Sequence, residues 1–182
     1  MIVAKQKRKE NIVEYLLYMW QVEDLIRANK FDSELINKNI VSRYDQPESV
    51  KKEILLWYEE LIEMMKQEGV TEKGHIQLNQ NIIIALTDLH LRLLKTPDEM
   101  VYAAAYYKTL PYIVELRSKA NSGETPELET CFTAIYGFLL LRMQGKEISE
   151  ETMTGIKQIS SFLAILAEKY RQDMNGELKQ VD

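Results

Sequence analysis

The sequence predicts an all-α fold, an antiparallel bundle of six long helices and one short helix. Six stretches of similar length carry apolar residues at spacings of three and four, the period of one helix face. Prolines stand where these helices would begin, because the N–H that proline lacks has no partner in a first helical turn. Glycines stand where the helices would end, because glycine tolerates the positive φ found there. With 7 Gly and 4 Pro, the chain has too few turn residues for a β-rich fold. The residues that mark helix ends are Pro47, Pro97, Pro126, Gly69, Gly123, Gly145 and Gly176.

The first long helix is predicted from Lys7 to Ala28, because its apolar residues form one stripe. A short helix near residues 32–39 follows, with Asp32 or Ser33 as its N-cap, since both side chains can accept from free backbone N–H groups. The stripe of the first helix consists of Ile12, Tyr15, Met19, Val22 and Ile26.

The next two long helices are predicted over residues 47–68 and from about residue 75 to 95. The second of them is apolar over most of its circumference, so we expect it to have neighbours on more than one side. The following helix begins at Thr96, Pro97 and Glu99, where a Thr N-cap, Pro at the first position and Glu at the third would form a capping box.

This helix, the fifth when the short helix is counted, carries two apolar stripes and an internal proline, Pro111. Since proline lacks an N–H, the carbonyl of Tyr107 loses its helical hydrogen bond, and we expect a kink. The sixth and seventh helices are predicted over residues 126–144 and 149–174. Long helices of matched length joined by short loops pack antiparallel, which gives the bundle.

Length and composition predict one globular domain over residues 1–182, with frayed ends at 1–6 and 177–182. The net charge of −5 is spread over both halves, and no reading helix is recognisable, so we expect no nucleic-acid partner. The longest apolar run, residues 132–141, is too short for a membrane span of about 20 residues. No secretory signal is evident at the start, and we expect a cytoplasmic protein with no membrane partner.

Chemistry-bearing residues are few. Cys131 is the single cysteine, which excludes an internal disulfide and a cysteine-rich zinc site. Glu72 and His75 have the spacing of a helical metal motif, but Gly74 places them in a turn, so we predict no metal and no cofactor. Cys131 fits best as a small apolar residue of its helix.

Two polar residues fall on apolar faces and are candidates for a site. His90 could be a general base or a ligand-binding group, or a core histidine bonded to a tyrosine or a carbonyl. Glu23 could be a catalytic acid, or could form a structural salt bridge with Arg27 one turn away. Asp88 and Arg92 have the same spacing and fit best as an ion pair.

The tyrosines after His90 are the best candidates for a ligand surface, because aromatic walls with polar tips suit small molecules. If a pocket exists, we expect it to contain His90, Tyr102 and Tyr106, with Glu23 as its carboxylate. The alternative is that these side chains fill the core.

Several blocks of the sequence resemble an uncharacterised family of small all-helical cytoplasmic proteins from Bacteroides and relatives. The resemblance covers nearly the whole chain and implies a single helical cytoplasmic domain, without implying an activity, a cofactor or a catalytic residue. The blocks are QKRKENIVEYLLYMWQVEDLIRA (6–28), LTDLHLRLL (86–94) followed by Thr96-Pro97, YYKTLPYIVELR (106–117) and ETCFTAIYGFLLLR (129–142).

Two classes of function therefore remain open. The first is a non-enzymatic interaction or assembly protein, a homodimer or a binder of another protein, since the helices offer more apolar surface than a minimal core needs. The second is a small-molecule-binding protein or enzyme with a pocket between the first, fourth and fifth long helices. The function itself is unknown from the sequence, which leans away from an enzyme.

Overall fold

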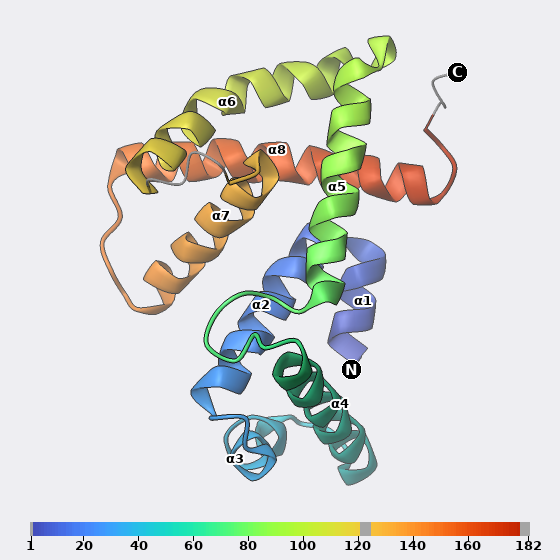
Figure 1. Ribbon diagram of the computed structural model, residues 1–182, viewed down its shortest axis with the longest axis vertical. Helices are drawn as coiled ribbons and strands as arrows, with labels where there is room; N and C mark the ends of the chain where they lie inside the picture. Colours follow the sequence, from blue (N-terminus) through green and yellow to red (C-terminus); the bar gives the residue numbers. More distant parts are fainter. Residues whose placement is uncertain (1, 121–124, 179–182) are drawn as a thin grey trace. The chain divides into compact units, whose positions relative to one another are not determined.

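The computed structural model describes residues 2–120 and 125–178, and the described part of the chain is helical throughout (Figure 1). It contains eight α-helices, two short 3-10 helices and no strand in these ranges, with 81% helix. The all-α prediction is confirmed. Gly123, one of the expected helix ends, lies outside the described residues. None of the described helices is both long and apolar enough to cross a membrane.

The chain divides into two compact units. Unit 1 consists of Met1–Glu10 and Glu14–Ile82, and unit 2 of Asn11–Val13 and Ile83–Asp182. Each unit is described here by itself, and the single domain expected over residues 1–182 stays a prediction.

Unit 1 begins with two helices where the sequence predicts one. The expected helix over residues 7–28 is interrupted at Asn11, whose Oδ1 accepts a hydrogen bond from the N–H of Val13 at 3.0 Å. An asparagine side chain competes with the helical ladder in this way and starts a new helix. The helices of unit 1 are α1 (Ile2–Glu10), α2 (Ile12–Ala28), α3 (Ser33–Asn39), η1 (Val41–Arg43), α4 (Glu48–Gln67) and the first residues of α5.

The turn after α2 is made without glycine. Lys30 and Phe31 have φ angles of 57° and 60°, and the N–H of Phe31 donates to the carbonyl of Ile26 at 3.1 Å. This arrangement satisfies the carbonyls at the end of α2. Asp32 then caps α3, because its Oδ1 accepts from the N–H groups of Glu34 and Leu35, as the sequence predicts.

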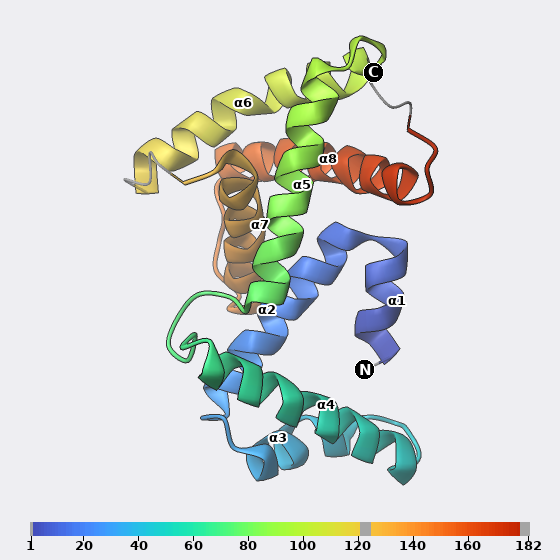
Figure 2. The same cartoon turned by 45° about the vertical axis from the view of Figure 1, so that its right-hand side comes forward.

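The core of unit 1 includes the contact of α3 with α4 (Figure 2). All five residues of the predicted stripe on α2 are 4% exposed or less. Other buried side chains of this core are Ile36, Val41, Tyr58, Leu61 and Met65.

Unit 2 is built from four long helices, of which α6, α7 and α8 contact one another pairwise. Its apolar core includes Tyr102, Ile113, Phe132, Phe162 and Leu166, each almost inaccessible to solvent. The elements are α5 (Gln77–Lys95), η2 (Pro97–Glu99), α6 (Met100–Ala120), α7 (Glu127–Met143) and α8 (Glu150–Met174).

The predicted capping box at the start of α6 is wrong. Thr96 makes no side-chain cap, and its Oγ1 instead donates to the carbonyl of Arg92 at 2.9 Å. The threonine hydroxyl is bonded back to the preceding turn, and no N–H of the new helix donates to it. Residues 97–99 form a 3-10 turn, from which α6 continues.

Helix α6 runs through Pro111 without ending, as predicted. The helix curves along its length in both Figure 1 and Figure 2, which agrees with the lost bond to the carbonyl of Tyr107. The predicted stripe that contains Tyr102 and Ile113 is buried at these two residues. In the second predicted stripe, Tyr107 is 63% exposed and Val114 56%.

Candidate functional site

His90 lies inside the core of unit 2, within a cage of three aromatic rings. Its ring centroid is 5.7 Å from that of Tyr102, 4.8 Å from Tyr106 and 5.8 Å from Phe162, all in edge-on geometry. A hydrogen bond of 2.6 Å joins its Nδ1 to the hydroxyl of Tyr102. Only 3% of His90 is exposed, so its polar group is bonded inside the protein.

The electrostatics of this cage favour neutral side chains. Burial lowers the pKa of His90, and the negative charge of Glu127 opposes that shift only in part. Burial also raises the pKa of Tyr102, with smaller contributions from Cys131 and Tyr106. A neutral imidazole bonded to a neutral phenol is the arrangement expected of a satisfied core histidine.

A second polar chain begins at Tyr106. Its hydroxyl donates to Oε2 of Glu127 at 2.7 Å, and burial and this bond both raise the pKa of Tyr106. Arg117 of α6 lies 3.8 Å from the other oxygen of Glu127, and also donates to the carbonyl of Thr125 and, at 3.4 Å, to Thr130. These bonds tie α6 to the start of α7.

Glu23 belongs to unit 1, and the predicted pair with Arg27 is wrong. The carboxylate accepts from Nδ1 of His75 at 2.5 Å, from the N–H of Ile76 at 3.1 Å and from the amide of Asn79 at 2.8 Å. No part of Glu23 is exposed. A buried carboxylate needs several donors; the loop before α5 supplies two of them and the first turn of α5 the third.

Arg27 is bonded elsewhere. Its guanidinium donates to Asp24 at 2.8 Å and to the carbonyls of Val70 and Gly74. Since one guanidinium has a fixed fork of donors, these partners orient it towards Asp24 and the loop rather than towards Glu23.

Of the four predicted site residues, the structure brings His90, Tyr102 and Tyr106 together in unit 2. Glu23 lies in the other unit, with a different histidine as its partner. The common site of all four stays a prediction. Arg92 forms an inter-helix ion pair, but its partner is Asp173 of α8 at 2.6 Å rather than Asp88.

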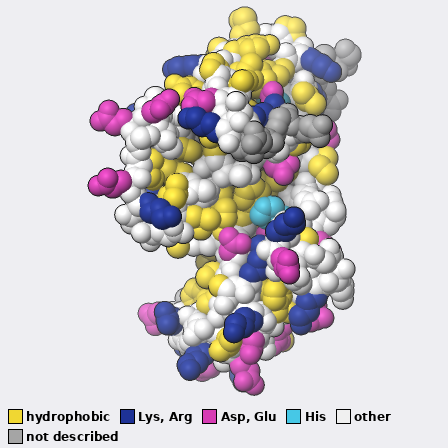
Figure 3. All heavy atoms as spheres, turned by 60° about the vertical axis from the view of Figure 1, so that its left-hand side comes forward, with side chains coloured by type: hydrophobic (Ala, Val, Ile, Leu, Met, Phe, Trp, Pro, Cys, Tyr) yellow, Lys and Arg dark blue, Asp and Glu magenta, His cyan; other side chains and the backbone are white. Residues whose placement is uncertain are grey.

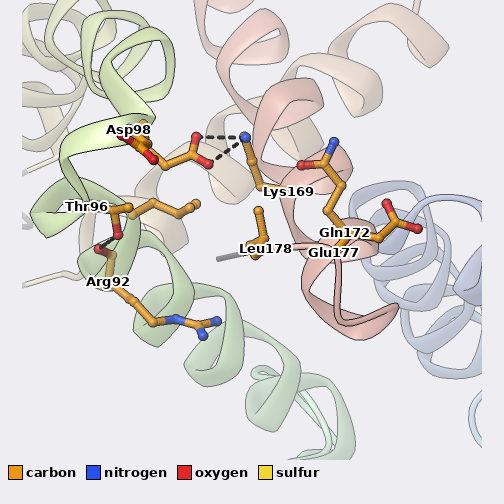
Figure 4. Close-up of a pocket in the computed structure, with 9 residues that line it drawn as sticks. Arg92, Thr96, Asp98, Lys169, Gln172, Glu177 and Leu178 are labelled. Carbon is orange, nitrogen blue, oxygen red and sulfur yellow. Dashed lines mark hydrogen bonds and ion pairs between the residues drawn. The ribbon is translucent and has the colours of Figure 1, made fainter. Parts of the chain in front are cut away.

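Unit 2 holds a cavity of about 220 Å³ where the junction of α5 and α6 meets the end of α8 (Figure 4). Lys169 reaches both carboxylate oxygens of Glu99 at 2.7 Å, and Leu178 lies between the two walls. The other lining residues that the figure labels are Arg92, Thr96, Asp98, Gln172 and Glu177. Lys169 and Glu99 pair with each other, Arg92 pairs with Asp173, and His90 is not part of the cavity.

The comparisons with known proteins identify a family. The model of the domain of unknown function DUF4924 matches residues 1–177. The chain belongs to the DUF4924 family. No curated protein and no solved structure was found to match this DUF4924 chain.

Three residues that the DUF4924 chain brings next to His90, Tyr106 and Glu23 could not be predicted from the sequence. Phe162 and Glu127 come from helices far along the chain from His90, and His75 lies 52 residues from Glu23. Local spacing carries no signal for such pairs. The one available signal was the position of Glu23 and Asn79 on apolar helix faces, which calls for a polar partner.

Within the described ranges, no three His, Cys, Asp or Glu side chains lie close enough to hold a metal ion together.

Proposed function

We propose that this protein is a non-enzymatic assembly protein that forms a homodimer through one face of α6. The observation that carries the proposal is a row of exposed, uncharged residues with a spacing of four and three along this helix. We refer to this row as the α6 outer face, which consists of Met100, Ala104, Tyr107, Pro111 and Val114.

The exposure of this row is unusual for a monomer. Met100 is 75% exposed, Tyr107 63% and Val114 56%, and all three lie on one side of a single helix. From Met100 to Val114 the row is about 21 Å long at 1.5 Å per residue. On the face drawn in Figure 3, hydrophobic side chains are exposed among the charged ones. Contiguous apolar surface of this kind marks interaction sites.

A second copy of the chain is the occupant that fits the α6 outer face best. If two α6 helices pack antiparallel about a two-fold axis, Tyr107 lies opposite Pro111 of the partner subunit, and Ala104 opposite Val114 of the partner subunit. Large residues then face small ones. Because the row carries no charged residue, no like charges meet across the axis. Such self-complementarity is what a two-fold interface requires.

The size of the contact sets the strength of this dimer. A contact between two helices over four turns buries an area at the low end of the range for stable interfaces. We therefore expect a dissociation constant in the micromolar range, on the order of 1–50 µM. Sedimentation equilibrium should show a mass that rises with concentration from 21.3 kDa towards twice that value.

Tyr107→Glu places two carboxylates near the two-fold axis and should leave a monomer with unchanged circular dichroism. The matched control is Leu56→Glu on α4. Leu56 is also apolar and exposed, at 58%, and its replacement should not alter the mass. A mass of 21.3 kDa for the unmodified chain at about 100 µM would contradict the proposal. A dimer that survives Tyr107→Glu would place the interface elsewhere.

The alternative is a small-molecule site at His90, Tyr102 and Tyr106, joined by Glu23. It has less support, because His90 is enclosed and bonded to Tyr102. Under our proposal His90→Ala lowers the melting temperature and leaves dimerisation intact. A cytoplasmic location and an origin in Bacteroides or relatives rest on the sequence resemblance and belong to the same proposal.

A further inference from the structure

Unit 1 contains a polar cluster that the proposed dimer does not use. Glu23 is completely buried in α2, and its three donors come from the end of the preceding loop and from the first turn of α5: His75, Ile76 and Asn79. Because Ile76 and Asn79 both donate to Oε1, the other oxygen is left to His75 alone. The carboxylate therefore fixes the orientation of this histidine.

The ring of His75 has one bonded edge and one free edge. Its Nδ1–H donates to Oε2 of Glu23 at 2.5 Å. Its ring stacks on that of Trp20, with 4.0 Å between the ring centroids and 8° between the ring planes. The side chain is 27% exposed. Nε2 has no hydrogen-bond partner among the described residues and is not one of their enclosed polar atoms, so it faces solvent.

A histidine held in this way is an oriented nucleophile. With the proton fixed on Nδ1, the lone pair lies on Nε2, and Glu23 stabilises the positive charge that the ring gains when Nε2 forms a bond. His90 offers a comparison within the same chain, since its Nδ1 is bonded to a tyrosine and its ring is enclosed.

The surroundings of His75 suit an anionic electrophile. Arg27 donates to the carbonyl of Gly74, the residue before His75, and also pairs with Asp24 at 2.8 Å. Helix α5 begins two residues later with no acidic side chain in its first turn, and the N-terminus of a helix favours negative charge. Glu68 also lies at this helix start, where its carboxylate accepts from the N–H of Gln77.

We propose that Nε2 of His75 is a phosphoryl acceptor. The lone pair of Nε2 attacks phosphorus of a phosphoramidate-type donor, the P–N bond of the donor breaks, and the amine leaves with its electron pair and its own protons. The product is an Nε2-phosphoimidazolium whose Nδ1–H stays bonded to Glu23. This site lies in unit 1, so the inference stands apart from the dimer through α6.

The test is reaction of the intact chain with phosphoramidate, followed by mass spectrometry and phosphorus NMR. We expect one phosphoryl group per chain, on Nε2 of His75, formed at least about tenfold faster than in the urea-unfolded chain. Glu23→Gln keeps an acceptor but removes the charge, and should slow the reaction by about tenfold or more. Glu14→Gln, an exposed change on the same helix, is the matched control and should react like the unmodified chain.

The folded-to-unfolded ratio of the unmodified chain keeps the test independent of how well the variants fold. Equal rates in the two states, an adduct on His90, or an unchanged rate in a folded Glu23→Gln variant would each overturn the proposal.

Discussion

Gly155 of α8 packs against the ring of Tyr112 of α6 so closely that a Cβ atom placed on it would lie 3.1 Å from Cδ1 of the tyrosine. The glycine thus sets the distance between these two helices. Alanine there gains helix propensity of up to about 1 kcal/mol but costs about 1–3 kcal/mol through overpacking. We expect Gly155→Ala to lower the free energy of unfolding in urea.

Gly137 in α7 provides the control, because a Cβ atom on it would meet nothing within 4 Å. Gly137→Ala should raise the free energy of unfolding by about 0.5–1 kcal/mol. Equal effects of the two changes would mean that α6 and α8 separate without cost.

Removal of the Glu23 side chain should strongly destabilise the protein. Glu23→Ala leaves three buried or partly buried donors without their acceptor, and we expect a loss of about 3–5 kcal/mol in urea unfolding. Glu14→Ala on the same helix removes a side chain that is 58% exposed and should cost less than about 1 kcal/mol. A small effect at Glu23 would show that water replaces the carboxylate.

Burial of His90 should make stability fall in mild acid. The pKa of His90 is lowered in the folded state, so below about pH 6.5 the unfolded chain takes up the proton first. Each pH unit below that value then lowers the free energy of unfolding by up to about 1.4 kcal/mol, until the pKa of His90 in the folded state is reached. Urea unfolding at about pH 7.5 and pH 5.5 measures this slope, and His90→Gln should flatten it.

Cys131 should be unreactive in the folded protein. Burial raises the pKa of its thiol to about 12, and a thiol rather than a thiolate is a poor nucleophile. We expect labelling by a disulfide reagent to proceed at the rate of unfolding in buffer and immediately in urea. Fast labelling in buffer would mean that α7 opens locally.

The helices could be predicted because their signals are local. Apolar spacing, Pro126 before α7 and the N-cap at Asp32 act within one or two turns, and the structure places the helix ends near them. The break at Asn11 was missed because asparagine inside an amphipathic stripe reads as a polar helix position until its side chain is seen to bond Val13.

The polar clusters could be predicted only in part. His90 and the tyrosines follow one another along the chain, so two consecutive helices bring them together. The partner of Glu23 comes from a loop 52 residues away, and Arg27, the nearest candidate, is taken by backbone carbonyls that a sequence does not display. Periodicity likewise predicts that α6 has two apolar stripes, but not that one of them stays exposed.

The division into two units also distributes the chain's natural spectroscopic probes. Both tryptophans, Trp20 and Trp57, belong to unit 1, whereas the single thiol, Cys131, belongs to unit 2. Intrinsic fluorescence therefore follows the melting of one unit, and thiol labelling follows the other. Coincident transitions at one urea concentration are the signature of the single cooperative domain that the sequence predicts.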